Sequence, residues 1–257
     1  MTTSLDPLAL FRLDGKIAVV TGASSGLGDR FARVLDAVGA RVVIAARRAD
    51  RLEALAADLT NAVVVPADLA QPADRERLVR VALDTCGRLD VLVNNAGIGR
   101  KVSLEDEPLD DFRATMEINV TAIWHLCQLA RDALVAGGGG SVVNVASMLG
   151  HVGSTPVKQA SYCASKGAVV NMTRELALQF ARRNVRVNAL CPGWFQSEMT
   201  AGMETDESAI AWIGQNSPMP RMGDAHELDG ALLLLAGAAG TFMTGQSLIV
   251  DGGWTAR

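Results

Sequence analysis

The sequence contains a single tyrosine, Tyr162, and a lysine follows it four residues later, at Lys166. On a helix this spacing places both side chains on one face, so that they can contact the same ligand. Lowering the pKa of a phenol from about 10 by about three units requires roughly 4 kcal/mol. An ammonium group about 4 Å away supplies roughly that energy at an effective dielectric constant of about 20. The pair therefore predicts a proton donor and acceptor, with the lysine lowering the pKa of the tyrosine.

Two more polar side chains fall where they could assist this proton transfer. Ser147 follows the apolar run at residues 141–145, and its hydroxyl could hold a substrate oxygen. Asn119 lies inside an apolar helical pattern, where asparagine is otherwise unfavourable. It could belong to the same site, or it could mark a helix kink or a buried water. These neighbours make the pair of Tyr162 and Lys166 a stronger candidate than its common spacing alone.

A glycine-rich segment follows the first apolar run and leads into a helical pattern; it reads Thr21-Gly22-Ala23-Ser24-Ser25-Gly26-Leu27-Gly28. Glycines at such a turn let the backbone approach a pyrophosphate, and the free N–H groups of the helix attract its negative charge. The spacing Gly-x-x-x-Gly-x-Gly differs from the standard Gly-x-Gly-x-x-Gly. The strand before it and the helix after it favour dinucleotide binding over an ordinary turn. The cofactor contacts expected here are Gly22, Ser24, Ser25, Gly26, Leu27 and Gly28.

The end of the second apolar run indicates which dinucleotide binds. An acid at this place accepts from the ribose 2′-OH of NAD(H), whereas arginine accommodates the 2′-phosphate of NADP(H). The run ends in Ala45-Ala46-Arg47-Arg48, without a carboxylate. We expect Arg47 and Arg48 to bind the phosphate, so NADP(H) is favoured over NAD(H). The alternative is that both arginines are solvated charges at the start of a helix, where a cation gains nothing from the helix dipole.

Further candidates follow the third and fourth apolar runs. Asp68, which precedes Leu69, could accept a hydrogen bond from the adenine amino group or could cap a helix. The segment Asn94-Asn95-Ala96-Gly97 ends the fourth run, at the edge where ligands of parallel sheets bind. Its asparagines could instead only satisfy loop backbone. The cofactor contacts expected here are Asp68, Leu69, Asn95, Ala96 and Gly97.

Short apolar runs alternate with longer helical patterns from Lys16 onward, which is typical of βαβ units. The runs are continuously apolar, as in strands that are covered on both faces. Strands are predicted at residues 17–21, 42–46, 62–65, 91–94, 141–145, 185–190 and 247–250. Helices are predicted at residues 27–38, 51–59, 73–85, 109–134, 164–181 and 225–235. The sequence thus predicts an α/β fold: one Rossmann-like, doubly wound domain over residues 1–257, with a seven-stranded parallel sheet and an N-terminal extension at 1–14.

Composition excludes several classes of function. The net charge of −4 over 257 residues argues against nucleic-acid binding, which needs an excess of Lys and Arg. The first 15 residues lack a basic start followed by an apolar run, and the apolar stretch 231–239 is too short to cross a membrane. The four cysteines have no close pair, so neither a disulfide framework nor a metal site is predicted, and a reducing cytoplasm is expected.

Taken in order, these motifs resemble the short-chain dehydrogenase/reductase family along nearly the whole chain. The family's cofactor motif is similar to the segment from Thr21 to Gly28, and its Asn-Asn-Ala-Gly motif to the segment from Asn94 to Gly97. The resemblance implies a catalytic tetrad of Asn119, Ser147, Tyr162 and Lys166. In it the tyrosine exchanges the proton, the serine orients the substrate, the lysine binds the nicotinamide ribose and the asparagine holds a water. It also implies cofactor contacts from Tyr162, Lys166, Pro192, Gly193 and Ser197.

The implied activity is hydride transfer between NADP(H) and a small-molecule ketone or secondary alcohol. Family members act on ketones, sugars, steroids and acyl-carrier thioesters, and no motif in this sequence separates these. Apolar residues within 194–222 indicate a substrate lid. The resemblance to tetrameric relatives implies a homo-oligomer, a tetramer or a dimer, with helices 109–134 and 164–181 packed across a two-fold axis.

Two alternative functions remain. A redox sensor that only binds the dinucleotide would not need all four tetrad residues. An epimerase or dehydratase of nucleotide sugars would share the fold and the Tyr/Lys pair, but such enzymes usually carry an extended C-terminal substrate domain, which this sequence lacks.

Overall fold

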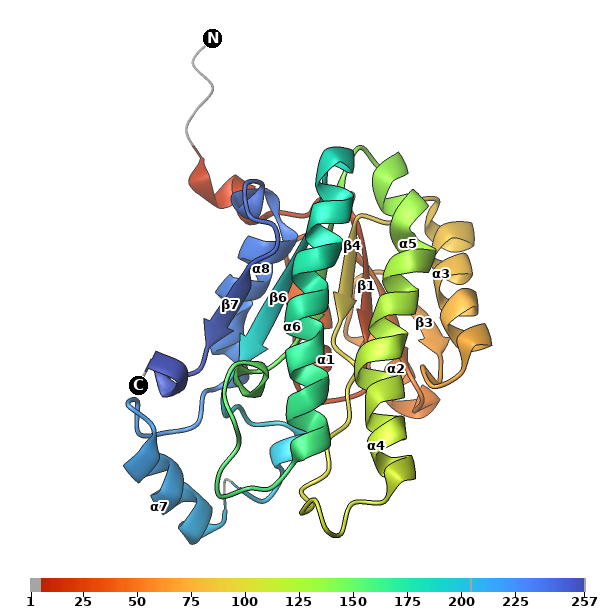
Figure 1. Cartoon of the computed structure of the whole chain (residues 1–257). Helices are drawn as coiled ribbons and strands as arrows, with labels where there is room; N and C mark the ends of the chain where they lie inside the picture. The colour runs from red at the N-terminus through yellow and green to blue at the C-terminus, as the bar shows by residue number, and fades with distance from the viewer. Residues whose placement is uncertain (1–5, 204, 257) are drawn as a thin grey trace.

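A computed structural model describes residues 6–203 and 205–256 of the chain. Its centre is a seven-stranded sheet in the order β3-β2-β1-β4-β5-β6-β7, and every neighbouring pair is parallel (Figure 1). The strands are β1 (Ile17–Thr21), β2 (Arg41–Ala46), β3 (Val63–Pro66), β4 (Val91–Asn94), β5 (Gly140–Val145), β6 (Val185–Pro192) and β7 (Ser247–Val250). The predicted α/β fold and all seven predicted strands are confirmed, with ends that differ by at most two residues.

Helices cover both faces of the sheet, as the unbroken apolar strands require. Residues of one strand alternate between two cores: Val19 of β1 faces one, and Ala18 and Val20 face the other. One face is covered by α3 (Pro72–Cys86), α5 (Ala122–Ala136) and α6 (Ala160–Phe180), and the other by α1 (Gly26–Ala37), α2 (Ala49–Ala57) and α8 (Asp229–Ala236) (Figure 1). The chain changes direction along the sheet between β1 and β4, which is the point where such sheets bind ligands.

The long helix predicted at residues 109–134 is interrupted. It begins as α4 (Leu109–Met116), widens into a π-helical turn at Glu117–Thr121 and continues as α5. Isolated π-turns are rare and occur frequently at functional sites. Asn119 lies in this turn and is completely buried. A local irregularity of the helix therefore coincides with Asn119.

Two helices differ from the prediction. The helix predicted from residue 164 already begins at Ala160, so Tyr162 lies in its first turn. The segment 194–222 contains an unpredicted helix, α7 (Glu207–Asn216), whose first turn is capped by the side chain of Asp206. The apolar residues of α7 had indicated only a lid. The signal for the helix was the Asp206 cap, because aspartate favours helix N-termini.

The described part of the N-terminal extension packs on the domain. Residues Pro7–Phe11 form a 3-10 turn, Leu13 is buried, and its N–H donates to the carbonyl of Val38. Part of the predicted extension therefore packs on the core. Residues 1–5, which begin the stretch of 15 residues that argued against a signal peptide, lie outside the described residues. Within the described ranges, no helix combines the length and the apolar character that crossing a membrane requires.

Candidate functional site

The glycine-rich turn between β1 and α1 lies directly against the loop that follows β4. Gly22 and Gly26 have positive φ angles of 67° and 56°, which L side chains rarely adopt. A Cβ on Gly22 would lie 2.8 Å from the Cα of Ala96, and one on Gly28 would lie 2.2 Å from the carbonyl oxygen of Gly22. Only glycine fits at these places, and the turn exposes bare backbone.

Hydrogen bonds lock these two loops together. The Thr21 hydroxyl accepts from the backbone N–H groups of Asn95, at 3.0 Å, and Ala96, at 3.1 Å. The side-chain nitrogen of Asn95 donates in return to the carbonyls of Thr21, at 2.9 Å, and Gly22, at 3.4 Å. The predicted cofactor residue Asn95 therefore holds the shape of the turn with its side-chain amide. Thr21, which the sequence had not indicated as a site residue, is its partner.

The turn has the features of a pyrophosphate site. Ser25 is the N-cap of α1, but its side chain makes no capping hydrogen bond, so no hydroxyl caps the N–H groups at the start of that helix. The helix dipole and these N–H groups favour an anion at this position. Backbone without side chains, free donors and nearby arginines together fit a dinucleotide phosphate.

The same loop after β4 reaches the predicted catalytic residues. A Cβ on Gly97 would lie 3.3 Å from Oδ1 of Asn119 and 3.4 Å from Nζ of Lys166. Two residues later, a Cβ on Gly99 would lie 2.8 Å from Cδ2 of the Tyr162 ring. The cradle and the tetrad are thus joined by five residues of chain. Sequence reasoning had not identified Gly99.

Lys166 is buried beside Tyr162. Its Nζ donates to the carbonyl of Val145 at 2.8 Å and lies 5.5 Å from the centroid of the Tyr162 ring. Burial lowers the pKa of Lys166 from its ordinary 10.5 to about 8. The ammonium form therefore still predominates at neutral pH.

The pKa of Tyr162 departs from the prediction. Burial raises it to about 12, while a side-chain hydrogen bond with Ser147 lowers it and the neighbouring Cys163 raises it. The expectation that Lys166 lowers the tyrosine pKa is wrong for the protein's own groups, because removing the phenolate from water costs more than its neighbours return. The tyrosine is therefore protonated at neutral pH.

Ser147 follows β5 and is buried at the start of a short 3-10 turn, where its hydroxyl accepts from the N–H of Leu149 at 3.1 Å. Its link to Tyr162 places both hydroxyls together. Next to them is a cluster of apolar side chains into which the Tyr162 ring packs, formed by Met148, Leu149, Val152, Cys163, Trp194, Trp212 and Trp254. The three tryptophans contact one another, with ring centroids 5.2–5.9 Å apart.

Asn119 is held from two sides. Its Oδ1 accepts from the N–H of Ile98 at 2.8 Å, and its Nδ2 donates to the carbonyl of Ile98 at 2.8 Å and to the hydroxyl of Ser165 at 2.9 Å. The carboxamide thus pairs the loop after β4 with α6, and its donors are both used. A water held by Asn119 would therefore bind at the second lone pair of Oδ1 or at the backbone of the residue.

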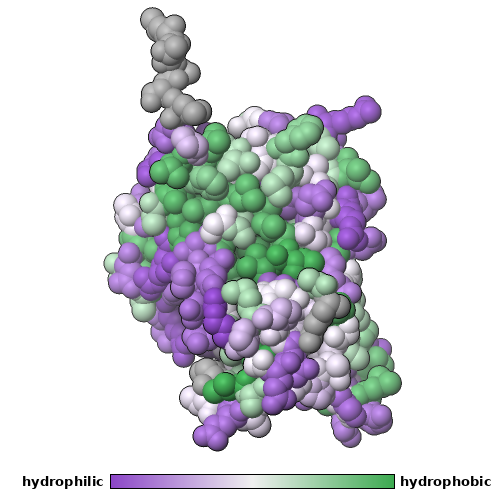
Figure 2. Space-filling model, turned by 90° about the vertical axis from the view of Figure 1, so that its left-hand side faces the viewer, coloured by the Kyte–Doolittle hydropathy of each residue, from purple (hydrophilic) through white to green (hydrophobic). Residues whose placement is uncertain are grey.

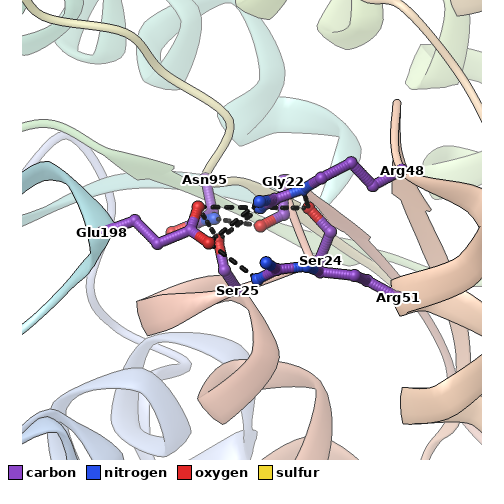
Figure 3. A network of polar contacts seen from close by, with 7 residues as sticks. All are labelled: Gly22, Ser24, Ser25, Arg48, Arg51, Asn95 and Glu198. Carbon is purple, nitrogen blue, oxygen red and sulfur yellow. Dashed lines mark hydrogen bonds and ion pairs between the residues drawn. The ribbon is translucent and has the colours of Figure 1, made fainter.

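The two predicted phosphate-binding arginines differ in position. Arg47 is exposed and makes no hydrogen bond or ion pair with the described residues. The guanidinium of Arg48 donates to the hydroxyls of Ser24, at 2.9 Å, and Ser25, at 2.8 Å, so it lies over the glycine turn (Figure 3). Arg51 lies beside it, one helical turn further along α2. Its three-residue spacing from Arg48 was a signal that could have identified it.

Asp68 and Leu69 follow β3. Leu69 is buried, while Asp68 accepts from the N–H of Ala70 at 3.1 Å and so stabilises a turn. The helix α3 is capped by Gln71, so the alternative prediction that Asp68 caps it is wrong. Its second carboxylate oxygen is available to a ligand, because no described residue bonds to it.

The segment after β6 returns to the glycine turn. The N–H of Gly193, which follows Pro192, donates to Val250, and a Cβ on Gly193 would lie 2.6 Å from the Cα of Asp251. Ser197 then lies against the cradle, since a Cβ on Gly26 would be 3.4 Å from the Cβ of Ser197. The lid predicted at 194–222 therefore starts on top of the predicted phosphate site.

The buried ammonium of Lys166 predicts a pH-dependent stability. Between pH 8 and 10.5 the unfolded chain keeps a proton that the folded chain releases, so the free energy of unfolding should rise with pH across this window. We expect wild type to gain about 3 kcal/mol relative to Lys166→Met between these pH values, measured by urea unfolding. The control is Lys158→Met at an exposed position, which keeps Lys166 and should therefore show the same rise with pH as wild type. A difference between wild type and Lys166→Met that is constant with pH would contradict the assignment.

Comparisons with known proteins agree with this geometry. The family model described as enoyl-(acyl carrier protein) reductase matches residues 22–255. Galactitol 2-dehydrogenase (L-tagatose-forming) of Cereibacter sphaeroides is 39% identical over 254 residues, which are 98% of this chain and 99% of that protein.

Several solved structures are also similar to this chain in sequence and in fold. A short-chain type dehydrogenase/reductase from Mycobacterium marinum is 35% identical with a TM-score of 0.93, covering 97% of this chain and 99% of that one. A gluconate 5-dehydrogenase from Burkholderia cenocepacia, in complex with NADP and tartrate, is 33% identical with a TM-score of 0.92, covering 98% and 100%. The motifs, the fold and these matches show that the chain belongs to the short-chain dehydrogenase/reductase family.

Proposed function

We propose that this chain is an oxidoreductase that interconverts a small-molecule carbonyl and a secondary alcohol with NADP(H). The observation that carries the proposal is the loop after β4. On one side Asn95 and Ala96 pack on the glycine turn, and on the other side Gly97 and Gly99 contact Lys166 and Tyr162. A cofactor whose phosphates bind the turn is thereby brought to the proton donor.

Tyr162 donates the proton to the substrate oxygen during reduction and accepts it during oxidation. A phenol that is protonated at neutral pH suits the donor role, so the pKa of about 12 favours carbonyl reduction. Ser147, which is hydrogen-bonded to it, orients the same substrate oxygen. The nicotinamide, when bound, supplies or accepts the hydride and in its oxidised form adds positive charge near the tyrosine.

Lys166 binds the ribose of the nicotinamide half. One of its three donors is used by Val145, and the other two have no partner among the described residues. An ammonium with unused donors beside Gly97 fits sugar hydroxyls. Asn119 positions the loop through Ile98 and holds the water of the proton relay.

The adenosine half binds between the ends of β2 and β3. Arg48 and Ser24 hold the 2′-phosphate, Arg47 screens it from solvent, and Asp68 accepts from the adenine amino group. Leu69 packs beside the base. The pyrophosphate lies on Gly22, Ser25, Gly26, Leu27 and Gly28, and Pro192, Gly193 and Ser197 contact the nicotinamide end. The NADP in the Burkholderia structure supports this choice of cofactor.

Sugars, polyols and their keto forms are the first substrate class to test. The named relatives act on galactitol and gluconate, which supports this class. Trp194, Trp212 and Trp254 line the wall beside Tyr162, and their faces can pack on the C–H groups of such a molecule. The segment 194–222 acts as the lid over it.

The whole chain acts as one domain and forms a homo-oligomer, a dimer or tetramer. The edge strand β7 pairs on one side only, and Figure 2 shows a broad apolar area on the face that carries it. Near this edge Phe242 is fully exposed, and Leu178 of α6 is 75% exposed. A second apolar surface on α4 and α5 exposes Leu109, Phe112 and Trp124. The four free cysteines support a reducing, cytoplasmic location.

Replacing Tyr162 with Phe should abolish turnover and leave cofactor binding intact. The variant removes the proton donor, and general acid catalysis contributes about 10²- to 10⁴-fold to rate. Turnover is measured as NADPH oxidation against keto-sugars, 3-oxoacyl thioesters, steroids and simple ketones, and NADPH affinity by fluorescence titration. Asn171→Ala, at an exposed position of the same helix, is the control and should stay within about threefold of wild type.

Unchanged turnover in Tyr162→Phe would contradict the catalytic assignment. Absence of turnover in wild type, with tight NADPH binding, would favour the redox sensor. Product with inverted configuration and no net NADPH oxidation would favour an epimerase.

Replacing Arg48 with Ala should weaken NADPH binding much more than NADH binding. A charged hydrogen bond to phosphate is worth about 1.5–3 kcal/mol, or roughly 10- to 150-fold in Kd. Arg47→Ala is the matched control and should cost only a few-fold, because Arg47 is exposed and makes no hydrogen bond or ion pair with the described residues of the turn. Equal losses for NADPH and NADH in Arg48→Ala would overturn the cofactor preference.

A further inference from the structure

A carboxylate from the lid occupies the predicted phosphate site. Glu198 accepts from Arg48 through both of its oxygens, at 2.9 and 2.8 Å, from Arg51 at 2.8 Å and from the hydroxyl of Ser25 at 2.8 Å. Figure 3 shows Glu198 approaching from one side and the two arginines from the other, with Ser24 and Ser25 close to both. Four donors thus converge on one anion.

This contact joins distant segments of the chain. Glu198 is 147 residues from Arg51 and 173 from Ser25. It belongs to the 3-10 turn Glu198–Thr200, which is held by a capping box between Ser197 and Thr200. The turn is therefore ordered by its own hydrogen bonds, and it carries the carboxylate into the cradle as a unit.

The donors suit a phosphate as well as a carboxylate. Planar guanidinium groups bind the paired oxygens of either anion through parallel N–H bonds. Arg48 and Arg51 follow β2, on the adenosine side of the cradle, and Ser24 also bonds to Arg48. A ribose 2′-phosphate placed there would need the donors that Glu198 now uses. Two anions cannot share them.

We propose that Glu198 is an internal competitor for the 2′-phosphate of NADP(H), and that Arg51 is the second arginine of that phosphate site. The inference rests on the proposed cofactor. Binding of NADP(H) displaces the Glu198 carboxylate, and NADH, which has no phosphate to take its place, leaves it on the arginines. Displacement also frees the start of the lid from the cradle.

The ion pairs are of a kind that a ligand can displace. The side chains of Glu198, Arg48 and Arg51 are 39–52% exposed, so their pairing is screened by solvent. Arg48, followed by Ser25, holds the pKa of Glu198 at about 2, so the carboxylate stays charged at all working pH values.

The test is the affinity for adenosine 2′,5′-bisphosphate, NADPH and NADH, measured by isothermal titration calorimetry on the full chain. Glu198→Gln should bind the first two roughly two- to fivefold more tightly, the range that loss of an exposed ion pair supports, and NADH should bind with the wild-type affinity. The control is Glu207→Gln, another exposed lid carboxylate, which should leave all three affinities unchanged.

A second variant makes the test independent of folding effects. In an Arg48→Ala background, Glu198→Gln should lose part of its gain, because Arg48 supplies two of the four hydrogen bonds that hold the carboxylate on the site. Arg51→Ala should weaken adenosine 2′,5′-bisphosphate and leave NADH unchanged.

Weaker or unchanged bisphosphate binding in Glu198→Gln would overturn the inference, and so would an equal gain for NADH. These results leave the proposed function standing as long as wild type binds NADPH. Failure of every variant and of wild type to bind either phosphate ligand would overturn the proposed function as well.

Discussion

The site depends on the close packing of two backbone turns, one after β1 and one after β4. They are adjacent because the order of the parallel sheet reverses direction between these strands. Their spacing is fixed by Thr21 and Asn95, whose side chains bond the opposite turn, and by Gly22 and Gly28, where a Cβ would collide with backbone. Without this contact the anion site and the proton donor would have no fixed geometry.

Burial explains the electrostatics on the other side of that contact. Lys166 is buried and Tyr162 is partly buried, both beside Gly97, Gly99 or the tryptophan cluster, and loss of water disfavours the charged form of both. The tyrosine is therefore kept protonated and the lysine is kept near its titration point. At the exposed glycine turn, charged side chains form ion pairs in contact with water. There Glu198 accepts hydrogen bonds from Arg48 and Arg51, the arginines proposed to bind a phosphate.

The sequence predicted the features that depend on a few neighbouring residues, namely the strands and the glycine turn. Continuous apolar runs located all seven strands, and the glycine spacing located the cradle, since each follows from backbone geometry over a few residues. It could not separate Arg47 from Arg48, because their orientation depends on where Ser24 lies in space. It also could not predict the hydrogen bonds of Glu198 with Arg51 or of Asn119 with Ile98, because these bonds join distant segments of the chain. The predicted direction of the Tyr162 pKa shift was wrong for the same reason. The spacing along the sequence predicts that Lys166 is near, but it does not show how far the tyrosine is removed from water.

The central claim is that one loop joins a phosphate cradle to a proton donor. A crystal structure of the complex with NADP⁺ tests it most directly. The account predicts the 2′-phosphate between Arg48 and Arg51, Lys166 bonded to the nicotinamide ribose and the Tyr162 hydroxyl beside the nicotinamide ring. A cofactor bound away from the glycine turn, or with its nicotinamide remote from Tyr162, would contradict it.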